Sequence, residues 1–188
     1  MNIREIVKEV IDDVLVQFQK YPDVFLTEED VRSCMVSRLL SYEELSLPSR
    51  TSERSLSIPV HSEVRWYGRS GVLKYRSDIV VLDVSSLKTG KYLKVPSKSY
   101  GFNKFYAVIE LKLRRKNSYS DNKFFKLVES DFKKIQKIIR EINFAGTNTF
   151  DADYYLICLD KKNDMSERFD DFNAHDSGIS FEYSFKKI

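Results

Sequence analysis

Cysteine and histidine are scarce in this chain, with two of each among 188 residues. Cys34 and Cys158 stand in apolar surroundings, and neither has a second cysteine at metal-ligand spacing. We therefore expect structural thiols of a reducing compartment rather than a disulfide or a zinc site. His61 lies in a strand-like segment without a ligand partner at fixed spacing, so we assign it no catalytic role.

Long apolar runs and a strong excess of charge are missing as well. No run approaches the length that crosses a membrane, and the N-terminal residues lack a signal-peptide pattern. We therefore expect a cytoplasmic protein without membrane contact. The net charge of +3 and the pI of about 8.7 permit a polyanionic partner without requiring one. Neither an internal repeat nor a helix-turn-helix or zinc-finger module is evident.

The overall amino-acid composition is typical of a globular domain. Hydrophobic residues make up 42% of the chain and charged residues 31%, and 188 residues can bury a sizeable core. We expect a single domain over residues 1–188.

Residues 105–113, with the sequence FYAVIELKL, are typical of a buried strand that Glu110 and Lys112 interrupt. Alternation along a strand puts both charges on one face, together with Tyr106 and Val108. The opposite face is then wholly apolar, with Phe105, Ala107, Ile109, Leu111 and Leu113. Because unpaired buried charge is costly, the two charges must face a cleft, a metal ion or each other. A plain Glu–Lys pair at the end of a strand is the simpler interpretation.

A second apolar strand, at residues 76–83, carries an acid near its beginning, Asp78. An acid on one strand followed by Glu-x-Lys on a later strand resembles the PD-(D/E)XK nuclease superfamily. The matching residues are Asp78 and then Glu110-Leu111-Lys112, whereas Ser77 stands where the superfamily often has proline. The resemblance implies an α/β restriction endonuclease-like fold, with an αβββαβ core and a mixed central sheet flanked by helices.

The resemblance also implies a Mg²⁺-dependent nuclease that hydrolyses phosphodiester bonds of DNA, with Mn²⁺ as a substitute metal. Asp78, Glu110 and the backbone carbonyl of Leu111 would bind the metal, because hard cations prefer oxygen ligands. Lys112 would position or activate the attacking water. Glu28, at the start of the second helix, is expected to be a further catalytic residue, with Glu29 as the fallback. An acid there also suits the helix dipole, which is the structural alternative.

Apolar spacing predicts the order of elements. Helices are expected at 3–20, from about 28 to 40 and at 122–142, and strands at 58–66, 72–83, 105–113, 154–159 and 179–185. A short surface helix is expected between the last two strands. Residues 24–160 would form the core, with 1–23 as an N-terminal helix extension and 161–188 as a C-terminal extension that supplies the extra strand.

Several basic and polar side chains are candidates for contact with nucleic acid, namely Arg114, Arg115, Lys116, Lys134 and Gln136. The lysines and aromatics of residues 84–104 could serve the same role, although a solvated loop is the simpler interpretation. We expect DNA as partner, with a homodimer or a partner subunit possible and no small-molecule cofactor. Two alternatives remain open: a non-catalytic nucleic-acid- or protein-binding subunit on the same fold, and a plain α/β interaction protein.

Overall fold

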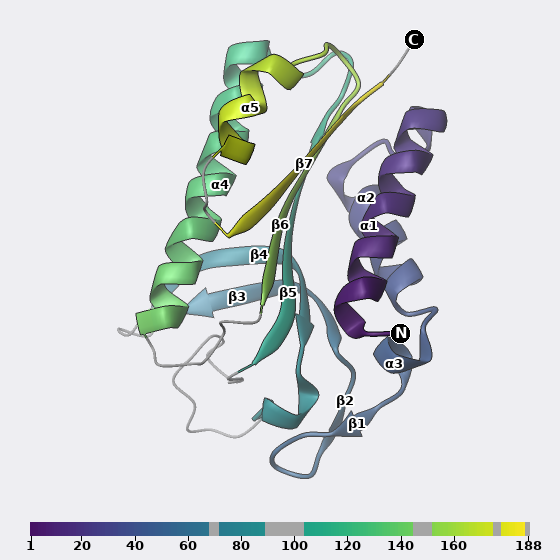
Figure 1. The fold of residues 1–188 in the computed structure, drawn as a ribbon, viewed down its shortest axis with the longest axis vertical. Helices are drawn as coiled ribbons and strands as arrows, with labels where there is room; N and C mark the ends of the chain where they lie inside the picture. The colour runs from purple at the N-terminus through teal and green to yellow at the C-terminus, as the bar shows by residue number, and fades with distance from the viewer. Residues whose placement is uncertain (68–71, 89–103, 145–151, 175–177, 187–188) are drawn as a thin grey trace.

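The computed structural model describes residues 1–67, 72–88, 104–144, 152–174 and 178–186 (Figure 1). The helices are α1 (Ile3–Lys20), α2 (Glu28–Leu39), α3 (Glu43–Ser46), α4 (Asp121–Phe144) and α5 (Ser166–Ala174), with 3₁₀ turns η1 (Pro22–Val24) and η2 (Val84–Ser86). The strands are β1 (Ser49–Arg50), β2 (Leu56–Ser57), β3 (Val60–Tyr67), β4 (Leu73–Leu82), β5 (Phe105–Arg114), β6 (Asp153–Asp160) and β7 (Ile179–Phe185). None of the described helices is both long and apolar enough to cross a membrane.

Five of the strands form one mixed sheet in the order β3-β4-β5-β6-β7. The pairs β3–β4 and β4–β5 are antiparallel, whereas β5–β6 and β6–β7 are parallel. β5 therefore lies at the centre of the sheet, at the boundary between its antiparallel and parallel halves. The order α2-β3-β4-β5-α4-β6 is the αβββαβ arrangement of a restriction endonuclease-like fold, which confirms the predicted fold class.

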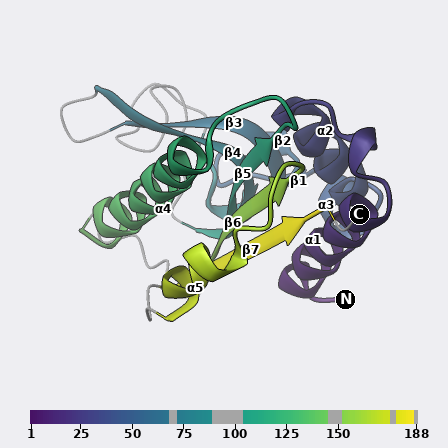
Figure 2. The ribbon, with the colours of Figure 1, turned by 90° about the horizontal axis from the view of Figure 1, so that it is seen from above.

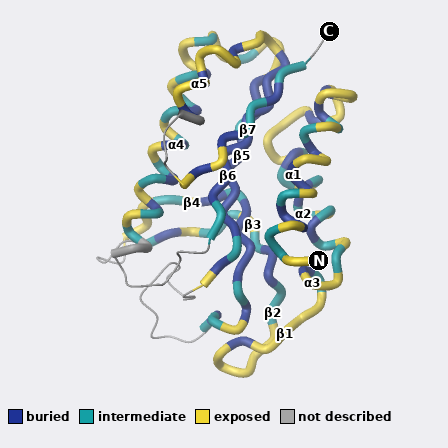
Figure 3. Tube along the Cα trace, in the orientation of Figure 1, coloured by how far each residue is buried: buried dark blue, intermediate teal, exposed yellow. Residues whose placement is uncertain are grey.

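Helices cover both faces of the sheet, with α1 and α2 on one side and α4 and α5 on the other (Figures 1 and 2). Two separate apolar clusters result, because alternate residues of β5 point to opposite faces. Ile109 and Leu111 pack in the cluster under α1 and α2, whereas Val108 packs in the cluster under α4 and α5. The central strands are accordingly the most continuously buried part of the chain (Figure 3).

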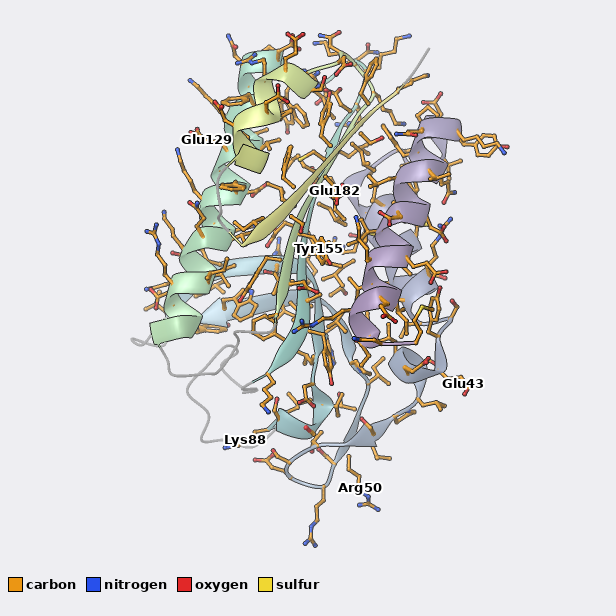
Figure 4. The ribbon with its side chains drawn as sticks, in the orientation of Figure 1. Glu43, Arg50, Lys88, Glu129, Tyr155 and Glu182 are labelled. Carbon is orange, nitrogen blue, oxygen red and sulfur yellow. The ribbon has the colours of Figure 1, made fainter. Side chains whose placement is uncertain are left out.

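The N-termini of the first two long helices are fixed by capping boxes, in which side chain and backbone satisfy each other's free groups. Asn2 and Glu5 form the box of α1, and Thr27 and Asp30 form that of α2. The predicted start of the second helix is thereby confirmed. A side-chain contact also joins α1 to the sheet: Glu182 of β7 accepts a hydrogen bond from Lys8 at 2.9 Å (Figure 4).

Two local predictions are wrong. The composition of residues 45–58, rich in Ser, Arg and Pro, predicts a loop, but the segment contains the end of α3 and the short antiparallel pair β1–β2. Phe105 and Tyr106 also lie on the faces opposite to those predicted, Phe105 under α4 and Tyr106 under α1 and α2. A register shift between Val81 and Leu82 accounts for the exchange. The extra residue of a β-bulge reverses which face of the sheet the following side chains occupy. Most of the connection at 84–104 lies outside the described residues.

Candidate active site

The candidate site lies where β4 stops pairing with β5. The last described pair of the two strands joins Ile79 to Ile109. Beyond it, the backbone N–H of Leu111 donates to Asp78 Oδ2 at 2.8 Å, and that of Leu113 donates to Glu28 Oε1 at 3.3 Å. Two carboxylates, one from a strand and one from a helix N-terminus, thus occupy the edge of β5 that β4 has left.

Glu110 is the most deeply buried acid of the site, with only 2% of the residue exposed. Its Oε2 accepts a hydrogen bond from Lys134 at 2.6 Å, whereas its Oε1 is buried without any hydrogen-bond partner among the described residues. Burial, with smaller contributions from Asp78 and Asp131, raises the pKa of Glu110 from 4.5 to about 8, against the opposing effect of Lys134. A buried oxygen without a partner is costly, so this carboxylate is poised for a proton or a cation.

Lys112 points to the same face of β5 as Glu110, as predicted from their spacing. Its Nζ lies 2.9 Å from Asp131 and 3.5 Å from Glu28. Burial alone would lower the pKa of Lys112, but the charges of Asp131 and Glu28 outweigh it and raise the pKa above its ordinary value. Lys112 is therefore held as an ammonium group.

The sequence interpretation did not assign a role to Asp131, although this acid of α4 links the two lysines of the site. It contacts Lys112 at 2.9 Å and Lys134 at 3.4 Å. One signal was available: Asp131 lies three residues after Val128, which is buried, and one before Phe132, also buried. An acid on the apolar side of an amphipathic helix needs a basic partner across the interface.

Arg32 of α2 is a second residue that sequence reasoning missed. Its guanidinium contacts the carboxylates of Glu29 and Glu63, and its Nη1 lies 3.3 Å from Asp78 Oδ1. Glu63 also accepts from Arg76 at 2.7 Å. Arg32 follows Glu28 by one helical turn, so its position could have been inferred once Glu28 was placed over the site.

The structure places Glu28, and not Glu29, beside Lys112. Glu28 Oε1 contacts both the Lys112 ammonium and the Leu113 N–H, whereas Glu29 contacts Arg32 and Ser33. Four of the residues singled out in the sequence, Asp78, Glu110, Lys112 and Glu28, are thus gathered at one end of β5.

The donor set fits a hard divalent cation that keeps several waters. Mg²⁺ needs only one or two carboxylates from the protein, and Asp78 and Glu110 supply them, with the partnerless Oε1 of Glu110 available. The N–H of Leu111 points to Asp78, and because the N–H and C=O of one strand residue point to the same side, we expect the Leu111 carbonyl on that side of β5. Within the described ranges, no three His, Cys, Asp or Glu side chains converge as a complete metal cage.

The candidates for nucleic-acid contact are placed very differently from one another. Arg114 is fully buried and paired with Asp160 and Asp121, so the prediction that it binds phosphate is wrong. Arg115 and Lys116, which follow β5, are exposed. Lys134 is engaged by Glu110, and Gln136 is half-buried on α4.

Arg115 also lines a shallow open hollow beside the site, together with the N-terminus of α2 and the segment that follows β5. The other lining residues are Thr27, Glu28, Glu29, Arg32, Leu113, Ser118 and Tyr119.

Comparison with known proteins adds a similarity of fold at low identity. No protein-family profile and no curated protein sequence matches the chain. Among solved structures, P. aeruginosa ATCC27853 NucC in its cAAA-bound form is 13% identical, with a TM-score of 0.45, and the alignment covers 96% of this chain and 74% of that one. E. coli MS115-1 NucC, also cAAA-bound, is 16% identical, with a TM-score of 0.43 and the same coverage. At these values we base the functional argument on the side chains alone.

Proposed function

We propose that this protein is a metal-dependent nuclease that hydrolyses phosphodiester bonds of DNA, with residues 24–160 as its core. The observation that carries the proposal is the convergence of Asp78, Glu110 and Lys112 where β4 leaves β5. Two acids on adjacent strands can hold a divalent cation, and a nearby ammonium group can stabilise the negative charge that develops when a phosphodiester is hydrolysed. The partnerless buried oxygen of Glu110 supports a ligand at this position.

Asp78, Glu110 and the carbonyl of Leu111 would hold Mg²⁺, for which Mn²⁺ is a plausible substitute. When bound, such a cation neutralises charge at the phosphate and lowers the pKa of a coordinated water. The residues of the chain then have to keep the acids ionised and the substrate in place. Glu28 supports this arrangement from α2 through Lys112 and the Leu113 N–H.

Lys112 would act as a cation rather than as a base. Its pKa is raised by Asp131 and Glu28, so at neutral pH it carries a proton that it does not readily give up. We infer that Lys112 orients the attacking water and stabilises the negative charge that develops on the phosphate. Of the two roles expected from the sequence, positioning is therefore favoured over proton abstraction.

Nicking of supercoiled plasmid DNA tests the proposal. The wild-type chain should nick the plasmid with Mg²⁺ or Mn²⁺ and not with a chelator. Asp78→Asn and Lys112→Met should each lower the rate by at least about a hundredfold. Lys8→Met, which removes the ion pairs of Lys8 with Asp12 and with Glu182 of β7, serves as control and should keep the wild-type rate. Equal rates for wild type and both site variants would remove the assignment.

A non-catalytic binding subunit is the second candidate, because Asp78, Glu110 and the ammonium group of Lys112 each have an ion-pair partner within the protein. A site that has lost its catalytic activity would keep such ion pairs because they stabilise the fold. Binding of DNA or of a protein without cleavage, under Mg²⁺ and Mn²⁺ and across varied substrates, would favour this candidate.

A further inference from the structure

Each of the two carboxylates proposed as metal ligands has a basic side chain against it, and the two basic side chains come from different helices. Arg32 of α2 lies 3.3 Å from Asp78, and Lys134 of α4 lies 2.6 Å from Glu110. The two pairs hold positive charge on both sides of the position that a metal ion would take between the carboxylates.

Both basic side chains also have acidic partners that are not proposed metal ligands. Arg32 contacts Glu29 and Glu63, and Lys134 lies 3.4 Å from Asp131. If Arg32 moved away from Asp78, or Lys134 from Glu110, each basic side chain would still have an acidic partner. This matters because an unpaired charge in a partly buried position is costly. These further acids can therefore pair with the two basic side chains after they have moved away from the proposed metal ligands.

A divalent cation between Asp78 and Glu110 would stand close to both basic groups, and like charges at such range repel strongly in a partly buried site. We infer that Arg32 and Lys134 are exchangeable counter-ions of the metal site, a conclusion that rests on the proposed function. In the metal-free protein Arg32 lies against Asp78 and Lys134 lies against Glu110; when a divalent cation binds, the two basic side chains shift to their second acidic partners. They thereby set the metal affinity of the site without being metal ligands.

Titration of the full-length chain with Mn²⁺, followed by electron paramagnetic resonance in the absence of nucleic acid, tests this inference. Arg32→Met and Lys134→Met each remove one competing charge and should lower the Kd for Mn²⁺ by at least about fivefold. Lys134→Arg keeps the charge and should bind Mn²⁺ much as the wild type does. Lys133→Met is the matched control, because Lys133 is the adjacent residue of α4 and pairs only with Glu129 among the described residues; its Kd should not change.

The outcomes separate this inference from the proposed function. If the wild type binds Mn²⁺ and Asp78→Asn does not, but the two methionine variants bind no more tightly than the wild type, the counter-ion inference is wrong and the metal site stands. If no variant binds Mn²⁺, both are wrong. Binding by a methionine variant where the wild type binds none would support the inference most strongly. Thermal melting confirms that each variant is folded, and Lys134→Gln replaces Lys134→Met if the latter is not.

Discussion

Replacing Glu110 by glutamine should remove a specific pH dependence from the stability of the metal-free protein. In the native state the pKa of Glu110 is raised to about 8, chiefly by burial, whereas its ordinary value is 4.5. Between these two values the native state holds a proton that the unfolded state has lost. Stability must therefore fall as the pH rises through this interval. Glutamine has no such proton, so Glu110→Gln should lack this fall.

The size of the effect follows from the same two values. Each pH unit over which the native state alone keeps the proton costs about 1.4 kcal/mol of stability, so the interval from 4.5 to about 8 gives at most about 5 kcal/mol. Lys134, Asp131 and Asp78 face the carboxyl group and are present in both proteins. The quantity to compare is therefore the difference between wild type and variant at each pH.

Urea unfolding in the presence of a chelator, repeated across this pH range, measures that difference. An offset that is equal at every pH reports only the change in packing and is not diagnostic. Glu129→Gln is the control, because Glu129 lies on the outer side of α4, where Lys133 contacts it at 2.7 Å (Figure 4). Parallel pH profiles for wild type and Glu110→Gln would refute the claim that this carboxyl group is buried and protonated in the metal-free site.

Three further predictions concern the framework of the site, and each is checked by urea unfolding. Asp160→Asn should cost about 3–5 kcal/mol, because it breaks a buried pair with Arg114; a loss below about 1 kcal/mol would contradict this. Thr27→Ala should cost about 1 kcal/mol by removing the cap of α2, and Thr27→Ser should restore most of it. Leu156→Ala should cost about 2–5 kcal/mol, because Leu156 of β6 is fully buried in the apolar cluster under α4 and α5; a neutral change would show that the core can close over the cavity.

Periodicity was sufficient to predict the main elements. The first helix was expected at 3–20 and spans Ile3–Lys20, and the strand carrying Glu110 was expected at 105–113 and spans Phe105–Arg114. These segments have apolar residues at the spacing that their buried faces demand. The exchange of Phe105 and Tyr106 could not be foreseen, because a bulge depends on how two strands pair and leaves no mark in either strand alone.

The motif residues of the site were found from the sequence, but their counter-ions were not. Glu110 and Lys112 are two residues apart on one strand, so their common face follows from local geometry. The pairs Arg32–Asp78 and Lys112–Asp131 join residues that are far apart in the chain. Helical spacing can show that Arg32 and Asp131 need partners, but it does not identify those partners. Arg114 was misassigned for the same reason, since its partner Asp160 lies on the neighbouring strand β6.

Diffraction from crystals soaked in Mn²⁺, with data collected at the manganese absorption edge, tests the central claim most directly. The account predicts one anomalous peak between Asp78 and Glu110, about 2.0–2.3 Å from a carboxylate oxygen of each, with Arg32 and Lys134 moved away from those oxygens. A peak elsewhere, or none at saturating metal with the ion pairs intact, would contradict it.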